Sequence, residues 1–297
     1  MARRSVARRL LGYPIEAAVV WLATALFGAL AIDRASALGG WLGRVLGPRL
    51  GRSRVAERNL RRAFPERAPA EVAAFVRAMW DNLGRVVAEF PHLGEIDVYA
   101  DGGRVETVGA EHLDALRAAG ASAIFFSAHL GNWEIASLCT SQKGMALTFI
   151  YRVANNPFIE RLVRKMRTPI AGDHFPKGAQ GAARLVAALR RGESVGMLVD
   201  QKLSRGIAAP FFGRDAMTAP TPALFAHKFG CPLVPVRVER LEGARFRVTI
   251  YPPMDVPDTG DREADVAATT ARINAVIEEW IRARPEQWLW IHRRWPE

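Results

Sequence analysis

A histidine and a glutamate five positions apart are the residues of this sequence best placed for acid–base chemistry. His129 follows an apolar run, Ala123–Phe126, which is typical of a short buried strand. Gly131 and Asn132 then predict a turn, after which an amphipathic helix begins. Because of this turn, His129 and Glu134 can fold back on each other. We expect Glu134 to fix the tautomer of His129 as a general base.

A histidine–acid pair with no serine or cysteine nucleophile at hand would deprotonate a group that the substrate brings. A hydroxyl that attacks an acyl group is the natural candidate. The alternative interpretation is a structural or incidental pair. The position of His129 at a strand end favours a site, because open α/β sheets bind ligands at the carboxyl ends of their strands.

The elements around this stretch alternate between apolar strands and helices. Two further apolar runs, Met145–Ile150 and Val195–Val199, end in Tyr151-Arg152 and in Asp200-Gln201. Apolar residues at helical spacing predict helices over Ala70–Phe90, Gly178–Arg191 and Ala264–Arg284. This alternation predicts a single α/β domain with a central, mostly parallel sheet flanked by helices. Polar groups at successive strand ends predict one shared site.

Two of these strand-end residues have a functional and a structural interpretation. Arg152 is either a surface arginine or a bidentate clamp on a phosphate or carboxylate. Asp200 either caps a helix, or pairs with an arginine such as Arg205, or orients Arg152 or a sugar hydroxyl.

Composition and charge narrow the classes of partner. The chain has 297 residues, a formal net charge of +11 and two cysteines, Cys139 and Cys231. A basic surface suits nucleic acid, anionic lipid headgroups or an acidic protein, but no nucleic-acid recognition motif is present, so we expect no nucleic acid partner. No disulfide framework, zinc motif, Walker loop or dinucleotide fingerprint occurs, and we expect no metal and no cofactor.

The amino-terminal segment is predicted to associate with a membrane. Four arginines in residues 1–15 precede an uncharged apolar run, Ala17–Ile32, and six more follow in residues 49–62. A membrane anchor, either a short span or an in-plane helix, is favoured over a cleaved signal peptide or a core helix. We therefore expect a basic segment with a membrane-anchoring helix over 1–48 and a catalytic domain over 49–297.

Several ordered motifs resemble one family over residues 15–297. His-Leu-Gly-Asn-Trp-Glu is similar to the His-x4-acid signature of the lysophospholipid acyltransferase superfamily, in the form found in lipid A biosynthesis acyltransferases of the lauroyl/myristoyl type. The other motifs also resemble that family, and they are Asn-Leu-x-x-Ala-Phe-Pro at 59–65, Tyr-Arg-x-x-Asn-Asn at 151–156, Asp-Gln at 200–201, Phe-Phe-Gly-x-x-Ala-x-Thr at 211–218 and Pro-Glu-x-Trp-x-Trp-x-His-x-Arg-Trp at 285–295. In the last motif, a membrane-interface role and a packed aromatic lid both remain open for the tryptophans, and His292 is expected to be supporting.

The resemblance implies transfer of a fatty acyl group from an acyl carrier protein thioester to a hydroxyl of a lipid A precursor of the Kdo-lipid IVA type. It implies a peripheral or anchored enzyme of the bacterial inner membrane with its active site on the cytoplasmic face. The partners implied are acyl carrier protein, an anionic glycolipid acceptor and a membrane surface. The site residues expected are listed by role: catalytic His129 and Glu134; substrate-binding Arg152, Asn156 and Asp200; oxyanion amides near Gly131 and Asn132.

Two alternatives to this function remain. Acyltransferases acting on a lysophospholipid, an aminolipid or another glycolipid would carry much the same motifs. A non-catalytic basic membrane-binding protein would explain the arginines and the anchor, but it would not explain polar groups at three strand ends.

Overall fold

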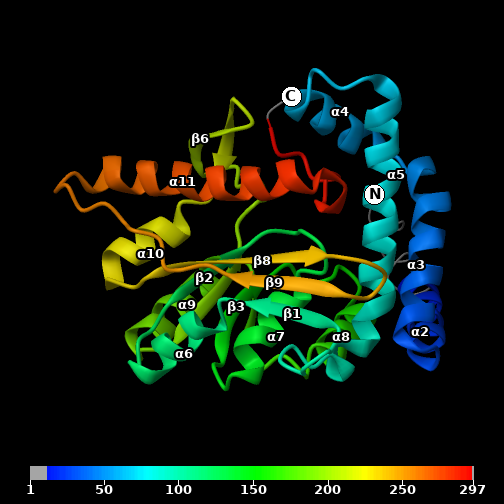
Figure 1. Cartoon of the computed structure of the whole chain (residues 1–297), viewed down its shortest axis with the longest axis horizontal. Coiled ribbons are helices and arrows are strands. Elements are labelled where there is room, and N and C mark those ends of the chain that lie inside the picture. The colour runs from blue at the N-terminus through cyan, green and yellow to red at the C-terminus, as the bar shows by residue number, and fades with distance from the viewer. Residues whose placement is uncertain (1–11, 296–297) are drawn as a thin grey trace.

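A seven-stranded sheet runs through the centre of the computed structural model, which describes residues 12–295 (Figure 1). The strand order is β1-β9-β8-β2-β5-β3-β4, and only β8 and β9 pair antiparallel. The strands are β1 (Val105–Val108), β2 (Ile124–Ser127), β3 (Leu147–Tyr151), β4 (His174–Pro176), β5 (Ser194–Leu198), β8 (Leu233–Arg240) and β9 (Phe246–Ile250). The predicted α/β domain with a mostly parallel sheet is thus confirmed.

Helices flank this sheet on its faces and along one side (Figure 1). They are α2 (Tyr13–Ala29), α3 (Ile32–Leu46), α4 (Ser53–Ala63), α5 (Pro69–Glu89), α6 (Ala110–Ala118), α7 (Glu134–Gln142), α8 (Pro157–Met166), α9 (Ala179–Arg190), α10 (Thr221–Phe229) and α11 (Arg262–Ala283), with short 3-10 turns at Gly47–Arg49, Phe90–Glu95 and Pro285–Gln287. A hairpin of β6 (Ile207–Phe211) and β7 (Arg214–Thr218) packs on α11. The helices expected over Ala70–Phe90, Gly178–Arg191 and Ala264–Arg284 are present with bounds shifted by one or two residues.

The alternation of side chains along β2 separates the two cores. Ile124 and Phe126 pack with α9 and α11, together with Ile277 and Trp280. Phe125 points to the opposite face and packs with Ile135 and Leu138 of α7. Strand β2 is buried on both sides, as expected for a central parallel strand, and its carboxyl end is held firmly in place.

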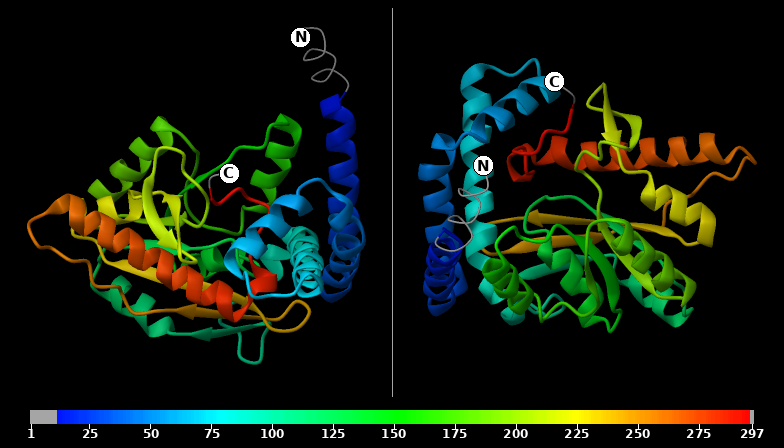
Figure 2. Two further views of the ribbon diagram at one scale, coloured as in Figure 1. Left: turned by 90° about the horizontal axis from the view of Figure 1, so that it is seen from above. Right: turned by 180° about the vertical axis from the view of Figure 1, so that it is seen from behind.

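Helix α5 stands beside the sheet and is joined closely by α3 (Figures 1 and 2). The approach of the two backbones depends on glycine, because a Cβ added at Gly84 would collide with the backbone oxygen of Gly39. This packing fixes the face of α5 that carries Asn82 and Glu89, both buried, toward the segment that follows β2.

The amino-terminal apolar run does not form one continuous helix. Helix α2 ends at Ala29, and Ile32 begins α3, so the run Ala17–Ile32 is divided by a bend. Among the helices of residues 12–295, none is long and apolar enough to cross a membrane. The arginines at positions 3, 4, 8 and 9 lie outside the described residues.

Candidate active site

Three parallel strands that lie side by side, β2, β5 and β3, bring their carboxyl ends to one edge of the sheet. His129 lies just beyond the end of β2 and Asp200 just beyond the end of β5. Nδ1 of His129 is 2.8 Å from Oδ1 of Asp200, and the backbone N–H of His129 donates to Oδ2 at 3.0 Å. The shared site expected at this edge is therefore built around His129 and Asp200.

The carboxylate that holds His129 is Asp200, and not Glu134 as the sequence spacing suggested. Asp200 is 2% exposed, and its Oδ2 also accepts a hydrogen bond from Nε1 of Trp288 at 2.7 Å. With its Nδ1–H donated to Asp200, His129 presents the lone pair of Nε2, which has the side-chain amide of Gln201 at 3.4 Å. This arrangement is that of a general base whose tautomer is fixed by an aspartate.

Two opposing effects act on the acidity of Asp200. Burial disfavours its charged form, but the charge of His129 and the hydrogen bonds from His129 and Trp288 outweigh this and lower the pKa of Asp200 from 3.8 to about 2. The carboxylate is consequently ionised at neutral pH. It can stabilise the imidazolium that forms when His129 accepts a proton.

Glu134 has a different partner, Arg167 of the segment after α8. The guanidinium of Arg167 donates to both carboxylate oxygens of Glu134, with Nε at 3.0 Å from Oε2. The indole N–H of Trp133 also donates to Glu134, at 3.2 Å. The ring of Trp133 packs edge-to-face on His129, with 5.1 Å between ring centroids. Glu134 therefore contacts Trp133, which packs on His129, and does not bond to His129 itself.

A largely apolar cavity extends from this edge of the sheet beneath α7. Glu134 and Arg167 form part of its wall, as does Trp133. Its apolar lining comes from α7 and strands β2, β3, β5 and β8: Phe125, Phe126, Ala136, Leu147, Phe149, Ile150, Met197, Leu198 and Val236. A cavity with this apolar lining suits a hydrocarbon chain.

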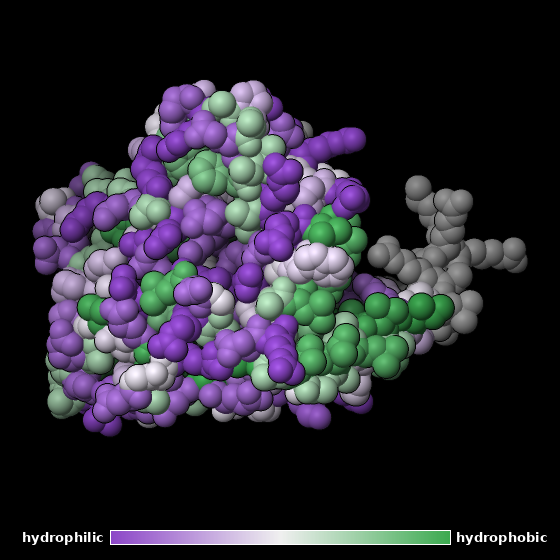
Figure 3. Space-filling view, turned by 45° about the vertical axis from the view of Figure 1, so that its right-hand side comes forward, coloured by the Kyte–Doolittle hydropathy of each residue, from purple (hydrophilic) through white to green (hydrophobic). Residues whose placement is uncertain are grey.

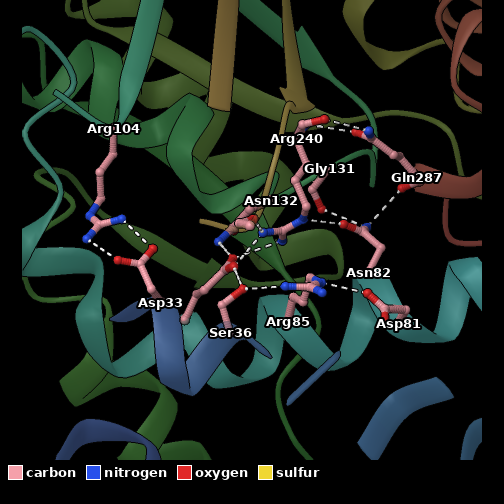
Figure 4. Close-up of polar contacts among 12 residues, drawn as sticks. Asp33, Ser36, Asp81, Asn82, Arg85, Arg104, Gly131, Asn132, Arg240 and Gln287 are labelled. Atoms are coloured by element: carbon pink, nitrogen blue, oxygen red, sulfur yellow. Dashed lines mark hydrogen bonds and ion pairs between the residues drawn. The ribbon is translucent and has the colours of Figure 1, made fainter. Parts of the chain in front are cut away.

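The turn after His129 is held by a buried polar network (Figure 4). Gly131 has a φ of 57°, and its N–H donates to the backbone oxygen of Gln287 at 3.1 Å. The side-chain amide of Asn132 donates to Glu89 at 2.9 Å. The N–H of Gly131 is thus engaged in holding the turn and is not free for an oxyanion, whereas the expected oxyanion role for the backbone amide of Asn132 stays a prediction.

Glu89 and Arg240 form the centre of this network. The two guanidinium nitrogens of Arg240 donate to the two carboxylate oxygens of Glu89, and its Nε donates to Asn82 at 2.8 Å. Ser36 of α3 donates to Glu89 at 2.6 Å. Glu89 is 0% exposed and Arg240 is 7% exposed, so this ion pair is removed from water and joins α3, α5, β8 and the turn.

The remaining predicted site residues lie elsewhere. Arg152 follows β3 with an exposed side chain, and no contact joins it to Asp200, so the expected support of Arg152 by Asp200 is absent. Asn156 is buried and structural in its contacts: it accepts from the N–H of Phe158 at the start of α8 and donates to the backbone oxygen of Tyr13 at 2.8 Å. A substrate-binding role for Asn156 therefore does not follow from its position.

The carboxyl-terminal motif packs onto the site. Trp288, Trp290 and Trp295 are between 0% and 3% exposed, so of the two interpretations the packed aromatic lid is confirmed. His292 accepts a hydrogen bond from the backbone N–H of Lys202 at 3.0 Å, close to Asp200 in sequence. Asn59 donates to the backbone oxygens of Trp290 and His292, which ties the 59–65 motif to this lid.

Sequence reasoning missed four residues of the site and its supports: Glu89, Arg167, Arg240 and Trp288. One signal was available for Arg167. A carboxylate on the buried face of a short apolar helix, as Glu134 is, requires a cation, and a helix rich in arginine and lysine follows next in the chain.

A histidine held by a carboxylate beside an apolar cavity is suited to the deprotonation of a hydroxyl that attacks an acyl group. The model of the family described as bacterial lipid A biosynthesis acyltransferase matches residues 1–297, and the chain belongs to this family. It is an acyltransferase.

Relatives at moderate identity agree with this assignment. The chain is 29% identical over 255 residues to the lipid A biosynthesis palmitoleoyltransferase of Escherichia coli, covering 82% of this chain and 78% of the relative. It is 26% identical to the lipid A biosynthesis lauroyltransferase of the same organism, with the same two coverages of 82% and 78%. It is 27% identical over 195 residues to a phosphatidylinositol mannoside acyltransferase of Mycobacterium tuberculosis, covering 63% of this chain and 58% of that relative.

The low pKa of Asp200 makes part of the stability pH-dependent. Folding lowers the pKa of Asp200, so the ionised carboxylate contributes fully to the free energy of unfolding above the ordinary value of 3.8. This contribution is lost as the pH falls toward about 2. We expect Asp200→Asn to have a free energy of unfolding about 2 kcal/mol lower than the wild type at pH 7. This difference should shrink below pH ~4. Urea unfolding from pH 7 to pH 2 measures this. A pH-independent difference would contradict the charge pairing, and Asp101→Asn at an exposed turn is the control.

Removing one member of the buried ion pair leaves the other charge without compensation. We expect Glu89→Gln to lower the free energy of unfolding by about 3–5 kcal/mol, because Arg240 remains buried. Glu57→Gln removes an exposed carboxylate paired with Arg61 and should change the free energy of unfolding by less than ~1 kcal/mol. Chemical denaturation of both variants compares them directly, and equal effects would show that the buried pair does not hold the fold.

Proposed function

We propose that the protein transfers a fatty acyl group from an acyl carrier protein thioester to a hydroxyl of a lipid A precursor of the Kdo-lipid IVA type, in lipopolysaccharide biosynthesis. The observation that carries the proposal is the His129–Asp200 pair beside a cavity with a largely apolar lining. Membership of the lipid A biosynthesis acyltransferase family supports the acceptor, as do the printed functions of the two relatives from Escherichia coli.

In this proposal, Nε2 of His129 removes the proton from the acceptor hydroxyl. The oxygen then attacks the thioester carbonyl, a C–O bond forms and the C–S bond breaks. The proton held by His129 passes to the leaving thiolate, so the base is restored for the next turnover. Asp200 stabilises the intermediate imidazolium, and it cannot leave its position without losing the hydrogen bonds to Trp288 and to the backbone of His129.

The cavity would hold the acyl chain of the donor. Its wall is mostly apolar, and the two charged side chains in it, Glu134 and Arg167, form an ion pair whose carboxylate also accepts from Trp133 beside His129. The hydrocarbon thus lies in a mostly apolar region, while the thioester lies near His129. Arg152, exposed at the neighbouring strand end, is the proposed contact for an anionic group of the acceptor.

The surface charge is suited to acidic partners. The net charge of the whole chain is +11, and Arg49, Arg52, Arg54 and Arg61 are exposed around α4. An acidic carrier protein and an anionic glycolipid are both attracted by such a surface.

An apolar face of α2 supports contact with the cytoplasmic side of the bacterial inner membrane. Ile15, Val19, Leu22 and Leu26 recur at helical spacing and are 65%, 62%, 71% and 54% exposed. Phe158 of the adjacent α8 is 48% exposed. Figure 3 shows an apolar area on the side formed by the amino-terminal helices. We propose that α2 lies in the plane of the membrane interface, which would bring an insoluble acceptor to the site.

A second acceptor class is favoured by one comparison. Among the relatives are phosphatidylinositol mannoside acyltransferases, at 26–27% identity. A glycolipid other than a lipid A precursor is therefore the alternative acceptor, and lysophospholipids and aminolipids extend that alternative.

The reaction is tested with the purified full-length chain, lauroyl-loaded acyl carrier protein and a tetra-acylated lipid A precursor. We expect a product heavier by one lauroyl group, and a loss of about 10²–10⁴-fold in rate for His129→Gln, because that variant lacks the base. His112→Gln, on the surface of α6, should retain the rate. Mass spectrometry of the lipid products measures both.

Parallel incubations distinguish the acceptors and the donors. Transfer only to a mannosylated phosphoinositide or a lysophospholipid would move the acceptor to the alternative class, and transfer from lauroyl-CoA alone would exclude the carrier protein. Full activity of His129→Gln would contradict the proposed base.

The cavity predicts which chain lengths are accepted. Ala136→Leu fills part of the cavity, so the preference for shorter over longer acyl thioesters should rise by about tenfold. Ala146→Leu adds the same volume at an exposed position outside the cavity wall and should leave the preference unchanged. Competition between acyl donors of different length, read by product mass, measures the ratio. An unchanged ratio in Ala136→Leu would place the acyl chain elsewhere.

A further inference from the structure

A histidine and two aspartates converge at the end of the sheet that lies opposite the candidate active site. His227 is in the last turn of α10, Asp258 is in the loop that leads to α11, and Asp265 is in the first turn of α11. One ligand atom from each lies within 4.8 Å of the others. Figure 1 shows α10 and the amino-terminal end of α11 together at the left of the view.

Nε2 of His227 is the feature that needs explanation. This atom is buried and has no hydrogen-bond partner. One ring nitrogen of the same histidine lies within 4.8 Å of a carboxylate oxygen of each aspartate. Buried ring nitrogens without partners are rare, because the loss of hydration is not offset. An imidazole beside two carboxylates is a donor set that a divalent cation satisfies.

The two aspartates differ in how firmly they are held. Asp265 is 3% exposed, and the backbone N–H and hydroxyl of Thr259 donate to its two oxygens at 2.8 and 2.9 Å. A carboxylate has lone pairs for about four contacts, so both oxygens retain acceptor capacity. Asp258 is exposed and can move its side chain by the small distance that coordination requires. The donor set therefore combines one rigid ligand with one adjustable ligand.

We propose that His227, Asp258 and Asp265 bind a divalent transition-metal ion that joins α10 to the start of α11. The chemistry of one imidazole nitrogen with two carboxylate oxygens favours Zn²⁺ or Mn²⁺ over Mg²⁺, which takes oxygen ligands and keeps several waters. The site is structural, since it lies near the amino end of β8, whereas His129 follows the carboxyl end of β2 that pairs parallel with β8. Sequence spacing does not predict it, because the ligands come from three separate segments.

Metal binding is tested on the full-length chain after treatment with EDTA. We expect one equivalent of Zn²⁺ to bind in calorimetry and to raise the Tm by a few degrees. Asp258→Asn should weaken binding by about tenfold or more without altering the fold, as judged by circular dichroism. Asp255→Asn, an exposed aspartate in the same loop, should bind as the wild type does.

The imidazole spectrum shows which histidine is involved. With ¹⁵N-labelled histidine, Zn²⁺ should shift the Nε2 resonance of His227, identified by its absence in His227→Gln. Absence of saturable binding by Zn²⁺ and Mn²⁺ would overturn the proposal. So would binding of equal strength in Asp258→Asn, or binding that shifts only other histidines. Because these measurements need no substrate, their failure would leave the proposed acyl transfer untouched.

Discussion

The buried ion pair between Glu89 and Arg240 is the constraint on which the site depends. Two charges are stable away from water only when they are paired and hydrogen-bonded, and here the groups that bond to them come from four separate parts of the fold. Ser36 and Asn82 connect helices α3 and α5 to the ion pair, and Asn132 connects the turn after His129 to it. The network therefore favours one arrangement, and that arrangement sets the path of the chain directly after His129.

The six residues from His129 to Glu134 have different roles in the structure. His129 is the proposed base and is held by Asp200, which follows the neighbouring strand. Gly131 supplies a positive φ where a Cβ would lie 2.7 Å from the backbone oxygen of Val238, and Asn132 is bound to the ion pair. Glu134 forms the wall of the cavity with Arg167. The His129–Glu134 motif thus combines one potential base, His129, with residues that hold the turn and line the cavity.

Much of the fold was predictable, because it rests on local periodicity. The apolar runs that end near Phe126, Ile150 and Val199 became β2, β3 and β5, and the shared edge followed from their parallel direction. The short strands β1 and β4 were missed, since three or four residues carry no clear alternation. The partner of His129 was missed for another reason. Choosing Asp200 over Glu134 requires the knowledge that β5 lies beside β2, and strand order is not encoded in local spacing.

The most direct test of the account is the identity of the carboxylate that binds Nδ1 of His129. In a spectrum of the ¹⁵N-histidine-labelled chain, the Nδ1 proton of His129 should resonate far downfield because Asp200 accepts its hydrogen bond. We predict that this resonance is lost in Asp200→Asn and retained in Glu134→Gln. Loss of the resonance in Glu134→Gln, with retention in Asp200→Asn, would contradict the site described here and would restore the pairing suggested by the sequence.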